Sequence, residues 1–374
     1  MTALESALAL TREIVRINNI NPPGKEDECA RHLGKILELA GFNLQYHSIA
    51  VGRSNLVARI GNGARAPLCF TGHIDTVPLG AAKWKKDPFA GETGSGKLFG
   101  RGTSDMKSGV AAFVVAAATL APHLRATPGL VLIITAAEET GCEGAFKLVK
   151  DEHLGLAGAI VVAEPTSNYP FVGHKGAFWL CAKAQGVTAH GSMPERGVNA
   201  VYKAARAVTA LENFRFPTPP HGLMGQSTLN VGSFHGGLNI NSVPDEATIA
   251  IDIRTVPGVS HAQLLRQVAR QVGGDISLEV IMDLESIYTP PEQEWVQSVF
   301  DIMQPILGER PQARAATYFT DAAALTPALG NPPTLILGPG EPQMAHQTDE
   351  YCVMERVLQS TAVFESIIAQ WCKV

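Results

Sequence analysis

Short, continuous apolar runs alternate with segments of helical pattern, and this alternation restricts the fold more than any other feature of the sequence. The strand-like runs include LCFTGHID (68–75), GLVLIITAAEE (129–139), AGAIVVAEP (157–165) and PTLILGPG (333–340). Helical patterns separate or flank them, as in MKSGVAAFVVAAATLAPHL (106–124) and VMERVLQSTAVFESIIAQW (353–371). Strands that are apolar throughout are buried on both faces. We therefore predict an α/β fold with a mostly parallel sheet covered by helices on both faces.

The middle of the chain follows a different order. From about residue 176 the patterns read strand, helix, strand, strand, helix, strand, which is the order of a ferredoxin-like α+β unit. A chain of 374 residues also exceeds what one compact core usually organises. We therefore predict a first domain made of 1–175 and 286–374, with a second domain, 176–285, inserted into it. An amphipathic helix is expected at the N-terminus, ending before Asn21-Pro22-Pro23-Gly24.

Composition excludes several classes of partner. The net charge is −5 and no basic block occurs, which argues against nucleic acid. No apolar run reads as long enough to span a bilayer, so no membrane is expected. The six cysteines have no paired spacing and are predicted to be free thiols in a reducing compartment. A cytoplasmic protein fits these features.

Polar side chains follow the predicted strands of the first domain at the point where each strand ends. They are His73, Glu138, Glu139, Glu164 and His346. Ligands of open α/β sheets bind beyond the carboxyl ends of the strands. Asp105 lies in a Gly-rich loop just before a helix, where a carboxylate meets favourable backbone dipoles. We therefore expect these residues to gather at one edge of the sheet.

Several carboxylates at one edge repel one another and raise their pKa values unless cations are present. Histidine and carboxylate ligands without thiolate favour zinc, with cobalt or manganese as alternatives. Two ions about 3.5 to 4 Å apart need a bridging carboxylate, and Asp105 is the best candidate. Glu139 and His346 would complete one metal site, and His73 and Glu164 the other. A bridging hydroxide would neutralise the remaining positive charge and act as the nucleophile.

Two further residues are expected to assist the reaction at the metal ions. Glu138 is the candidate general base, which takes the proton of the water and gives it to the leaving amine. A local break in the strand is needed, because Glu138 and Glu139 would otherwise point to opposite faces. Asp75 is expected to hold the far nitrogen of His73, as carboxylates often do for zinc-binding histidines.

Three other motifs point to different chemistry, and each lacks a required part. GETGSGKL (91–98) nearly matches a phosphate-binding loop but has Leu98 in place of Ser or Thr, and a hairpin turn is expected instead. SDMK (104–107) has the S-x-x-K spacing of serine penicillin-binding enzymes but no partner motifs. Cys142 is read as an inert thiol rather than a nucleophile.

Taken together, TGHIDTVP, GRGTSDMKSG, AAEETG, VVAEPT and GPGEPQMAHQTDEY resemble the dinuclear zinc metallopeptidase family. That family contains acetylornithine deacetylase, succinyl-diaminopimelate desuccinylase, glutamate carboxypeptidase and the aminoacylases. The similarity runs along nearly the whole chain and preserves the order of the motifs. It implies a zinc-peptidase-like catalytic domain with two zinc or cobalt ions held by the five ligands named above. It also implies a lid domain through which the protein forms a homodimer.

The resemblance extends to substrate-binding residues. His190, in GVTAHGSMPERGVNAV, resembles the histidine that reaches the partner subunit's site and donates to the developing oxyanion. Asn241 and Arg254 lie in the segment that meets the substrate, although a structural ion pair remains an alternative for Arg254.

The implied activity is hydrolysis of the amide bond of a small N-acylated amino acid. The chain resembles acetylornithine deacetylases at HKG (174–176) and near its end, and desuccinylases at NINSVPDEATIAIDIR (239–254). A desuccinylase, a glutamate-carboxypeptidase-like enzyme or another amidase of the family therefore stays open. The alternative of another class is a non-catalytic binding or dimerisation module of the same fold.

Overall fold

The computed structural model describes residues 3–63, 65–152 and 154–374 and separates into two compact units. Unit 1 comprises the chain up to Gly173 together with Tyr288–Arg314 and Thr320–Val374; unit 2 comprises His174–Ile287 and Ala315–Phe319. The predicted domain boundaries at 176 and 285, and the role of a lid, remain predictions. The strands β8 (Gly173–His174) and β13 (Ile287–Tyr288) lie where the chain passes from one unit to the other.

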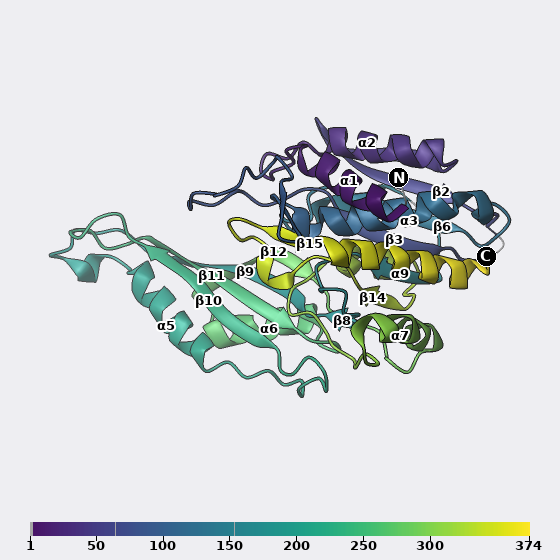
Figure 1. Ribbon diagram of the computed structural model, residues 1–374. Helices are drawn as coiled ribbons and strands as arrows, with labels where there is room; N and C mark the ends of the chain where they lie inside the picture. Colours follow the sequence, from purple (N-terminus) through teal and green to yellow (C-terminus); the bar gives the residue numbers. More distant parts are fainter. Residues whose placement is uncertain (1–2, 64, 153) are drawn as a thin grey trace. The chain divides into compact units, whose positions relative to one another are not determined.

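Unit 1 is built on a six-stranded sheet with the order β1-β2-β6-β3-β7-β14 (Figure 1). Its strands are β1 (Asn43–Ala50), β2 (Arg53–Ile60), β3 (Leu68–His73), β6 (Leu130–Thr135), β7 (Ala159–Val162) and β14 (Thr334–Ile336). The four strands β6, β3, β7 and β14 run parallel to one another. Strand β2 pairs antiparallel with β6, and β1 pairs antiparallel with β2. Every residue of the parallel strands is buried. The prediction of a mostly parallel sheet with strands buried on both faces is confirmed.

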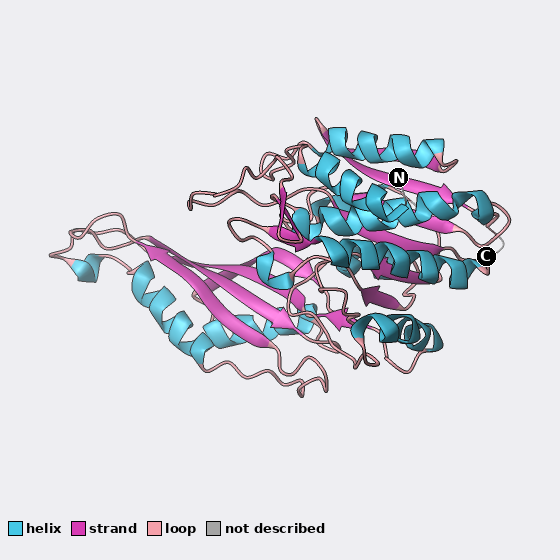
Figure 2. Ribbon diagram, viewed as in Figure 1, coloured by secondary structure: helices cyan, strands magenta, loops and turns pink. Residues whose placement is uncertain are grey.

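Helices cover this sheet and form the rest of the core of unit 1 (Figure 2). The helices are α1 (Ala3–Val15), α2 (Glu26–Leu39), α3 (Ser108–Leu124), α4 (Glu143–Asp151), α7 (Glu294–Leu307), α8 (Ala322–Ala328) and α9 (Met354–Cys372). Helices α1, α3 and α9 contact one another, and α4 contacts α8 and the strands β1 and β2. The predicted N-terminal helix is α1, although the first two residues of that prediction lie outside the described residues.

Short elements complete unit 1. A kinked turn, η1 (Thr103–Lys107), in which Asp105 and Met106 have non-helical backbone angles, leads into α3. A short 3₁₀ turn, η3 (Pro342–Met344), precedes His346. The strands β4 (Thr93–Gly94), β5 (Lys97–Phe99) and β15 (Tyr351–Val353) form a small antiparallel sheet. The hairpin expected within GETGSGKL is the β4–β5 pair.

Within the described residues, one helical stretch, Thr103–Leu124, passes a length and hydropathy test for a membrane span, and its most apolar window is 72% buried inside the structure. It is longer than the sequence suggested, because η1 runs directly into α3. Such burial is that of the core helix of a globular unit.

Unit 2 contains an antiparallel sheet with the order β10-β11-β9-β12. Its elements follow one another as β9 (Gly176–Gln185), α5 (Ala200–Glu212), β10 (Thr228–Gly236), β11 (Glu246–Thr255), α6 (His261–Val272) and β12 (Ile276–Leu284), with a short turn η2 (Pro194–Arg196) before α5. Helix α5 contacts all four strands and α6. This confirms the predicted strand–helix order of an α+β unit.

The close approach of α3 to β7 predicts an unusual effect for Gly109→Ala. In a helix interior this change normally stabilises by about 0.5–1 kcal/mol. Here the added Cβ would lie 2.1 Å from the carbonyl oxygen of Ala163, so helix or strand must move. We expect a net loss of about 1–3 kcal/mol, measured as a lower urea midpoint.

The matched control is Gly34→Ala in α2. Its Cβ would meet the hydroxyl of Tyr46, which is the far end of a side chain that can rotate away. An equal loss of stability in both variants would contradict the steric explanation.

Candidate metal centre

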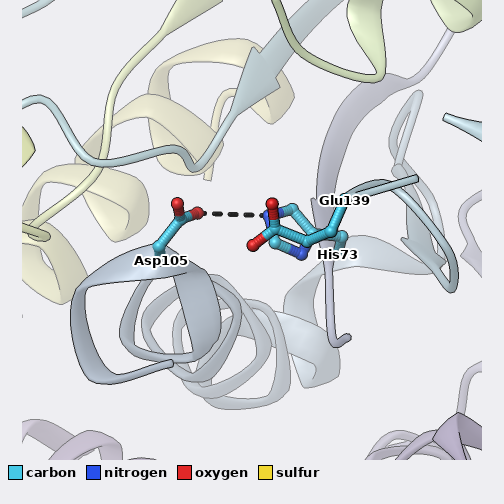
Figure 3. Close-up of side chains that lie close together, drawn as sticks. All are labelled: His73, Asp105 and Glu139. Carbon is cyan, nitrogen blue, oxygen red and sulfur yellow. Dashed lines mark hydrogen bonds and ion pairs between the residues drawn. The ribbon is translucent and has the colours of Figure 1, made fainter. Parts of the chain in front are cut away.

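The ends of neighbouring parallel strands bring the predicted ligands to one edge of the sheet in unit 1. His73 is the last residue of β3, Glu139 follows β6, and Glu164 follows β7. Asp105 comes from η1, and His346 from the loop beyond β14. Figure 3 shows the side chains of His73, Asp105 and Glu139 pointing toward one another. One nitrogen of His73 and one oxygen from each of the other two lie within 4.8 Å of one another.

Asp105 lies between the two histidines. Its Oδ1 is 3.2 Å from Nε2 of His73, and its Oδ2 is 3.5 Å from Nε2 of His346. Glu164 lies on the first side, 3.8 Å from His73 Nε2, and Glu139 on the second, 3.1 Å from His346 Nε2. Asp105 thus presents one oxygen to each of two groups, and each group holds one histidine and one glutamate.

The buried carboxylates of the cluster carry negative charge that a bound cation would balance. Burial raises the pKa values of Glu138 and Glu164 well above their ordinary value, and burial with the nearby Asp105 raises the pKa of Glu139. Hydrogen bonds to Asp105 and Glu139 raise the pKa of His346 to about 10. Glu139 Oε1 is buried without a hydrogen-bond partner. Mixed nitrogen and oxygen donors with an unpaired buried oxygen fit divalent metal ions.

Asp75 orients the site in two ways. Its carbonyl oxygen lies 3.0 Å from His73 Nδ1, and its carboxylate oxygen lies at 3.5 Å. The carboxylate accepts hydrogen bonds from Asn21 Nδ2 at 2.9 Å and from the backbone N–H groups of Glu138 and Glu139 at 3.1 and 3.2 Å. Asp75 therefore ties the end of β3 to the turn after β6. The sequence suggested the contact with His73 and did not indicate the contact with that turn.

The turn after β6 contains the expected break. Ala137 has φ +59°, in the left-handed region that residues other than glycine rarely adopt. Glu138 and Glu139 therefore do not alternate as they would in a strand. Glu138 is 5% exposed, and its Oε1 lies 3.8 Å from the thiol of Cys142. Burial raises the pKa of that thiol well above its ordinary value, so Cys142 is a neutral donor.

Glu350 and Arg101 form a buried ion pair that sequence reasoning missed. Arg101 Nη1 lies 2.8 Å from Glu350 Oε2. The Glu350 carboxylate also accepts the backbone N–H groups of Gly102, Ser104 and Asp105 at 2.8–3.1 Å. Glu350 follows His346 by four residues, so this pair joins the loop of His346 to the loop of Asp105. Glu350 lies in the segment GPGEPQMAHQTDEY, but a glutamate in a loop has no pattern that would mark it as a buried partner of Arg101.

Asp321 is a second buried carboxylate that the sequence did not indicate. It accepts a short hydrogen bond from the hydroxyl of Thr135 at the end of β6, and burial raises its pKa to about 6. It lies at the start of α8, beside the thiol of Cys142. The carboxylate of Asp321 therefore adds negative charge close to Glu138.

The other predicted site residues, His190, Asn241 and Arg254, lie in unit 2. His190 forms a β-bridge with Ser242, next to Asn241, and its Nδ1 lies 2.7 Å from Ser192 Oγ. Arg254, near the end of β11, lies 2.9 Å from Asp252. Its guanidinium faces the rings of Trp179 and Phe319, with the Cζ atom 5.8 and 5.9 Å from the ring centroids.

Comparison with known proteins agrees with this fold and cluster. A family model described as peptidase family M20/M25/M40 matches residues 69–370. A probable succinyl-diaminopimelate desuccinylase of Staphylococcus epidermidis is 30% identical, with 98% of each chain covered. An acetylornithine deacetylase of Proteus mirabilis is 31% identical over 91% of this chain and 89% of its own.

Solved structures share the fold. An M20 family metallo-carboxypeptidase from Sulfolobus solfataricus has a TM-score of 0.81 at 16% identity, covering 98% of this chain and 99% of its own. A dinuclear metal binding peptidase from the M20 family of Bacillus subtilis has a TM-score of 0.75 at 14% identity, covering 99% of both. Fold, side-chain cluster and relatives define a hydrolase of the metallopeptidase class that acts on amide bonds. The chain belongs to the peptidase family M20/M25/M40.

The Glu350 contacts predict that Glu350→Gln weakens metal binding. The change removes the counterion of Arg101 and a strong acceptor of the loop that carries Asp105. We expect the affinity for Zn²⁺, measured by titration against a competing chelator, to fall about 10–100-fold.

Glu341→Gln provides the control. Glu341 is also a buried glutamate paired with an arginine, Arg356, but its carboxylate does not contact the loop of Asp105. Equal zinc affinities in the wild type and Glu350→Gln would refute the positioning role.

Proposed function

We propose that the protein is a metal-dependent amidohydrolase of N-acylated amino acids, similar in activity to acetylornithine deacetylase, that uses two divalent ions, with zinc favoured. The observation that carries the proposal is the position of Asp105, with one carboxylate oxygen toward His73 and the other toward His346. Asp105 would bridge the ions, with Glu164 and Glu139 completing the two sites. Bound ions would polarise the scissile carbonyl and lower the pKa of a bound water.

Glu138 and Asp75 of unit 1 and His190 of unit 2 would transfer or orient protons. Glu138 would take the proton of the attacking water and pass it to the leaving amine nitrogen. Its buried carboxylate has no salt bridge to a described lysine or arginine, which leaves it available for this role. Asp75 would hold His73 through Nδ1, so that Nε2 faces the metal site. His190 would donate to the developing oxyanion.

Substrate recognition would fall to Asn241 and Arg254. The guanidinium of Arg254 is partly neutralised by Asp252 and packs beside two aromatic rings. An acyl amino acid would therefore meet an amphipathic surface rather than an isolated positive charge. Desuccinylase activity, glutamate-carboxypeptidase-like activity and other amidase activities of the family remain alternatives, because relatives of both the deacetylase and desuccinylase names match at similar identity.

We also propose a homodimer formed through unit 2. The strand β10 is at an edge of the sheet, with free backbone groups that a second copy could pair with. Large apolar side chains lie exposed in unit 2: Phe234 is on β10, Leu238 and Ile240 follow it, Val198 precedes α5 and Tyr202 is on α5.

The positions of His190 and Arg254 also favour two copies. His190 bridges to Ser242 before the start of β11, whereas Arg254 lies near the other end of that strand. The eight steps of strand from Glu246 to Arg254 span about 26 Å. A small substrate cannot meet both ends of one sheet, so His190 of one subunit would act on the substrate bound by the other. A cytoplasmic location is proposed as well, because all six cysteines are free.

A hydrolysis screen tests the proposed activity. Wild-type protein loaded with zinc, cobalt or manganese is offered acetyl, succinyl and aromatic acyl amino acids, and amine release is measured. We expect hydrolysis that is lost on chelation. Glu138→Gln should keep its metal but lose about 10²–10⁴-fold in turnover.

The exposed neighbour Glu143→Gln should behave as the wild type. Normal turnover by Glu138→Gln would show that the base is misassigned. A protein without metal that cleaves none of these substrates would favour the non-catalytic module.

Mixing two inactive variants tests the shared site. Dimers that combine Glu138→Gln with His190→Ala hold one intact site if His190 serves the partner. After subunit exchange, we expect about a quarter of wild-type activity, since half of the dimers are mixed and each has one working site.

A mixture of Glu138→Gln with Glu139→Ala is the control, because both changes fall in unit 1, and it should regain nothing. Proven mixed dimers without recovered activity would exclude the crossed arrangement.

A further inference from the structure

The face of the unit 2 sheet opposite its helices holds a compact group of one aspartate, one arginine and two aromatic rings. Phe178 on β9 stacks against His261 of α6 and so marks the face that the helices cover. Its neighbour Trp179 points to the other face, because successive side chains of a strand alternate. Asp252 lies directly opposite Trp179 on β11, and Arg254 follows two residues later, so all three share that other face.

A single carboxylate holds this group together. Asp252 Oδ1 accepts a hydrogen bond from Trp179 Nε1 at 2.7 Å and lies 2.9 Å from Arg254 Nε. Its Oδ2 lies 3.3 Å from the same arginine nitrogen. Among the described residues, no hydrogen bond or ion pair involves either Nη group of Arg254. The planar guanidinium is therefore fixed at its Nε side and leaves two donor nitrogens for a ligand.

Two aromatic rings flank this guanidinium. Arg254 Cζ lies 5.8 Å from the ring centroid of Trp179 and 5.9 Å from that of Phe319. The two rings meet edge to face, with their centroids 6.4 Å apart. Both residues are only partly buried, so some of their apolar surface stays open. A pair of free donors and an apolar wall therefore lie side by side in one rigid group.

This combination selects the chemistry of a ligand. A carboxylate would bind both free nitrogens of Arg254 in the bidentate manner typical of guanidinium groups. A planar ring attached close to that carboxylate would pack on the aromatic wall, where ring contacts add to its burial. A second cation, such as the ammonium group of ornithine, would meet the positive charge of Arg254. The carboxylate of Asp252 offers it little compensation, because two donors already share it.

We propose that Trp179 and Phe319 give the protein a preference for acyl amino acids in which an aromatic ring lies close to the carboxylate. This preference rests on the proposed amide hydrolysis, whose substrate class it defines. The ring would come either from the amino acid, as in N-acetylphenylalanine, or from the acyl group, as in N-benzoylglycine. Arg254 would bind the carboxylate in both cases, and the two rings would discriminate between substrates.

A comparison of kcat/KM across four substrates tests the preference: N-acetylphenylalanine, N-benzoylglycine, N-acetylglycine and N-acetylornithine. With zinc-loaded wild type, we expect the better aromatic substrate to exceed the glycine and ornithine compounds by about 10-fold or more. The better of the two aromatic substrates identifies the source of the ring. Phe319→Leu should lower kcat/KM for that substrate about 10-fold, mainly through KM, and change the value for N-acetylornithine less than about 2-fold.

Further variants separate recognition from folding. Phe319→Tyr keeps the ring and should retain the preference, whereas Trp179→Leu should lose it by an independent change. Phe216→Leu is the matched control, because it removes one ring of an edge-to-face pair with Phe214 elsewhere in unit 2, and it should leave every value unchanged. Equal kcat/KM for all four substrates, a higher value for N-acetylornithine, or an equal loss in Phe216→Leu would overturn the preference.

Ligand binding to Glu138→Gln distinguishes this outcome from failure of the proposed function, since that variant should hold the four compounds without cleaving them. Calorimetry should show tighter binding of an aromatic compound than of N-acetylornithine, and Phe319→Leu in the same background should abolish the difference. That result would support the aromatic surface even if the wild type hydrolysed none of the four. Hydrolysis without any aromatic preference in rate or binding would leave the proposed function intact and refute the role of the rings.

Discussion

The buried pair of Arg101 and Glu350 is the interaction on which the geometry of the candidate metal centre depends. Two buried charges lose much of their hydration, and an isolated pair often fails to recover that cost. This pair is extensively bonded: Arg101 also donates to the carbonyl oxygens of Pro78 and Gln347, at 3.0 and 3.2 Å, and stacks near the ring of Trp84. Burial still raises the pKa of Glu350 to about 7. The pair therefore holds together three loops, those that follow His73, precede α3 and follow His346, at an electrostatic cost.

The sheet of unit 1 provides the rigidity that makes such a cluster of charges tolerable. Burial and repulsion raise the pKa values of Glu138, Glu139 and Glu164, so these carboxylates oppose folding when no cation is bound. The strands that precede them are buried along their whole length and pack closely against α3, as the contact of Gly109 with Ala163 illustrates. The buried apolar layers stabilise unit 1, and they hold in place the loops that carry the candidate site residues.

The strands and most of the ligand cluster could be predicted because a continuous apolar run fixes where a buried strand ends. His73, Glu139 and Glu164 follow such runs directly, and the structure brings them to one sheet edge. Glu350 and Asp321 have no comparable signal. Each is a single acid in a loop or at a helix start, and its partners are 249 and 186 residues away in sequence. Periodicity reports local burial and does not report such long-range pairs. For the same reason the sequence did not place Ala315–Phe319 in unit 2.

The candidate residues divide between the two units by their proposed roles. The candidate residues for water activation all lie in unit 1, and the candidates for substrate recognition, His190, Asn241 and Arg254, all lie in unit 2. If the proposed roles hold, a substitution in unit 2 would change which acyl group is accepted without disturbing a candidate metal ligand. Relatives named as a deacetylase and as a desuccinylase then match this chain at 31% and 30% identity. The surroundings of Arg254, with Asp252 on one side and aromatic rings on the other, are therefore where the acyl preference of this protein would be decided.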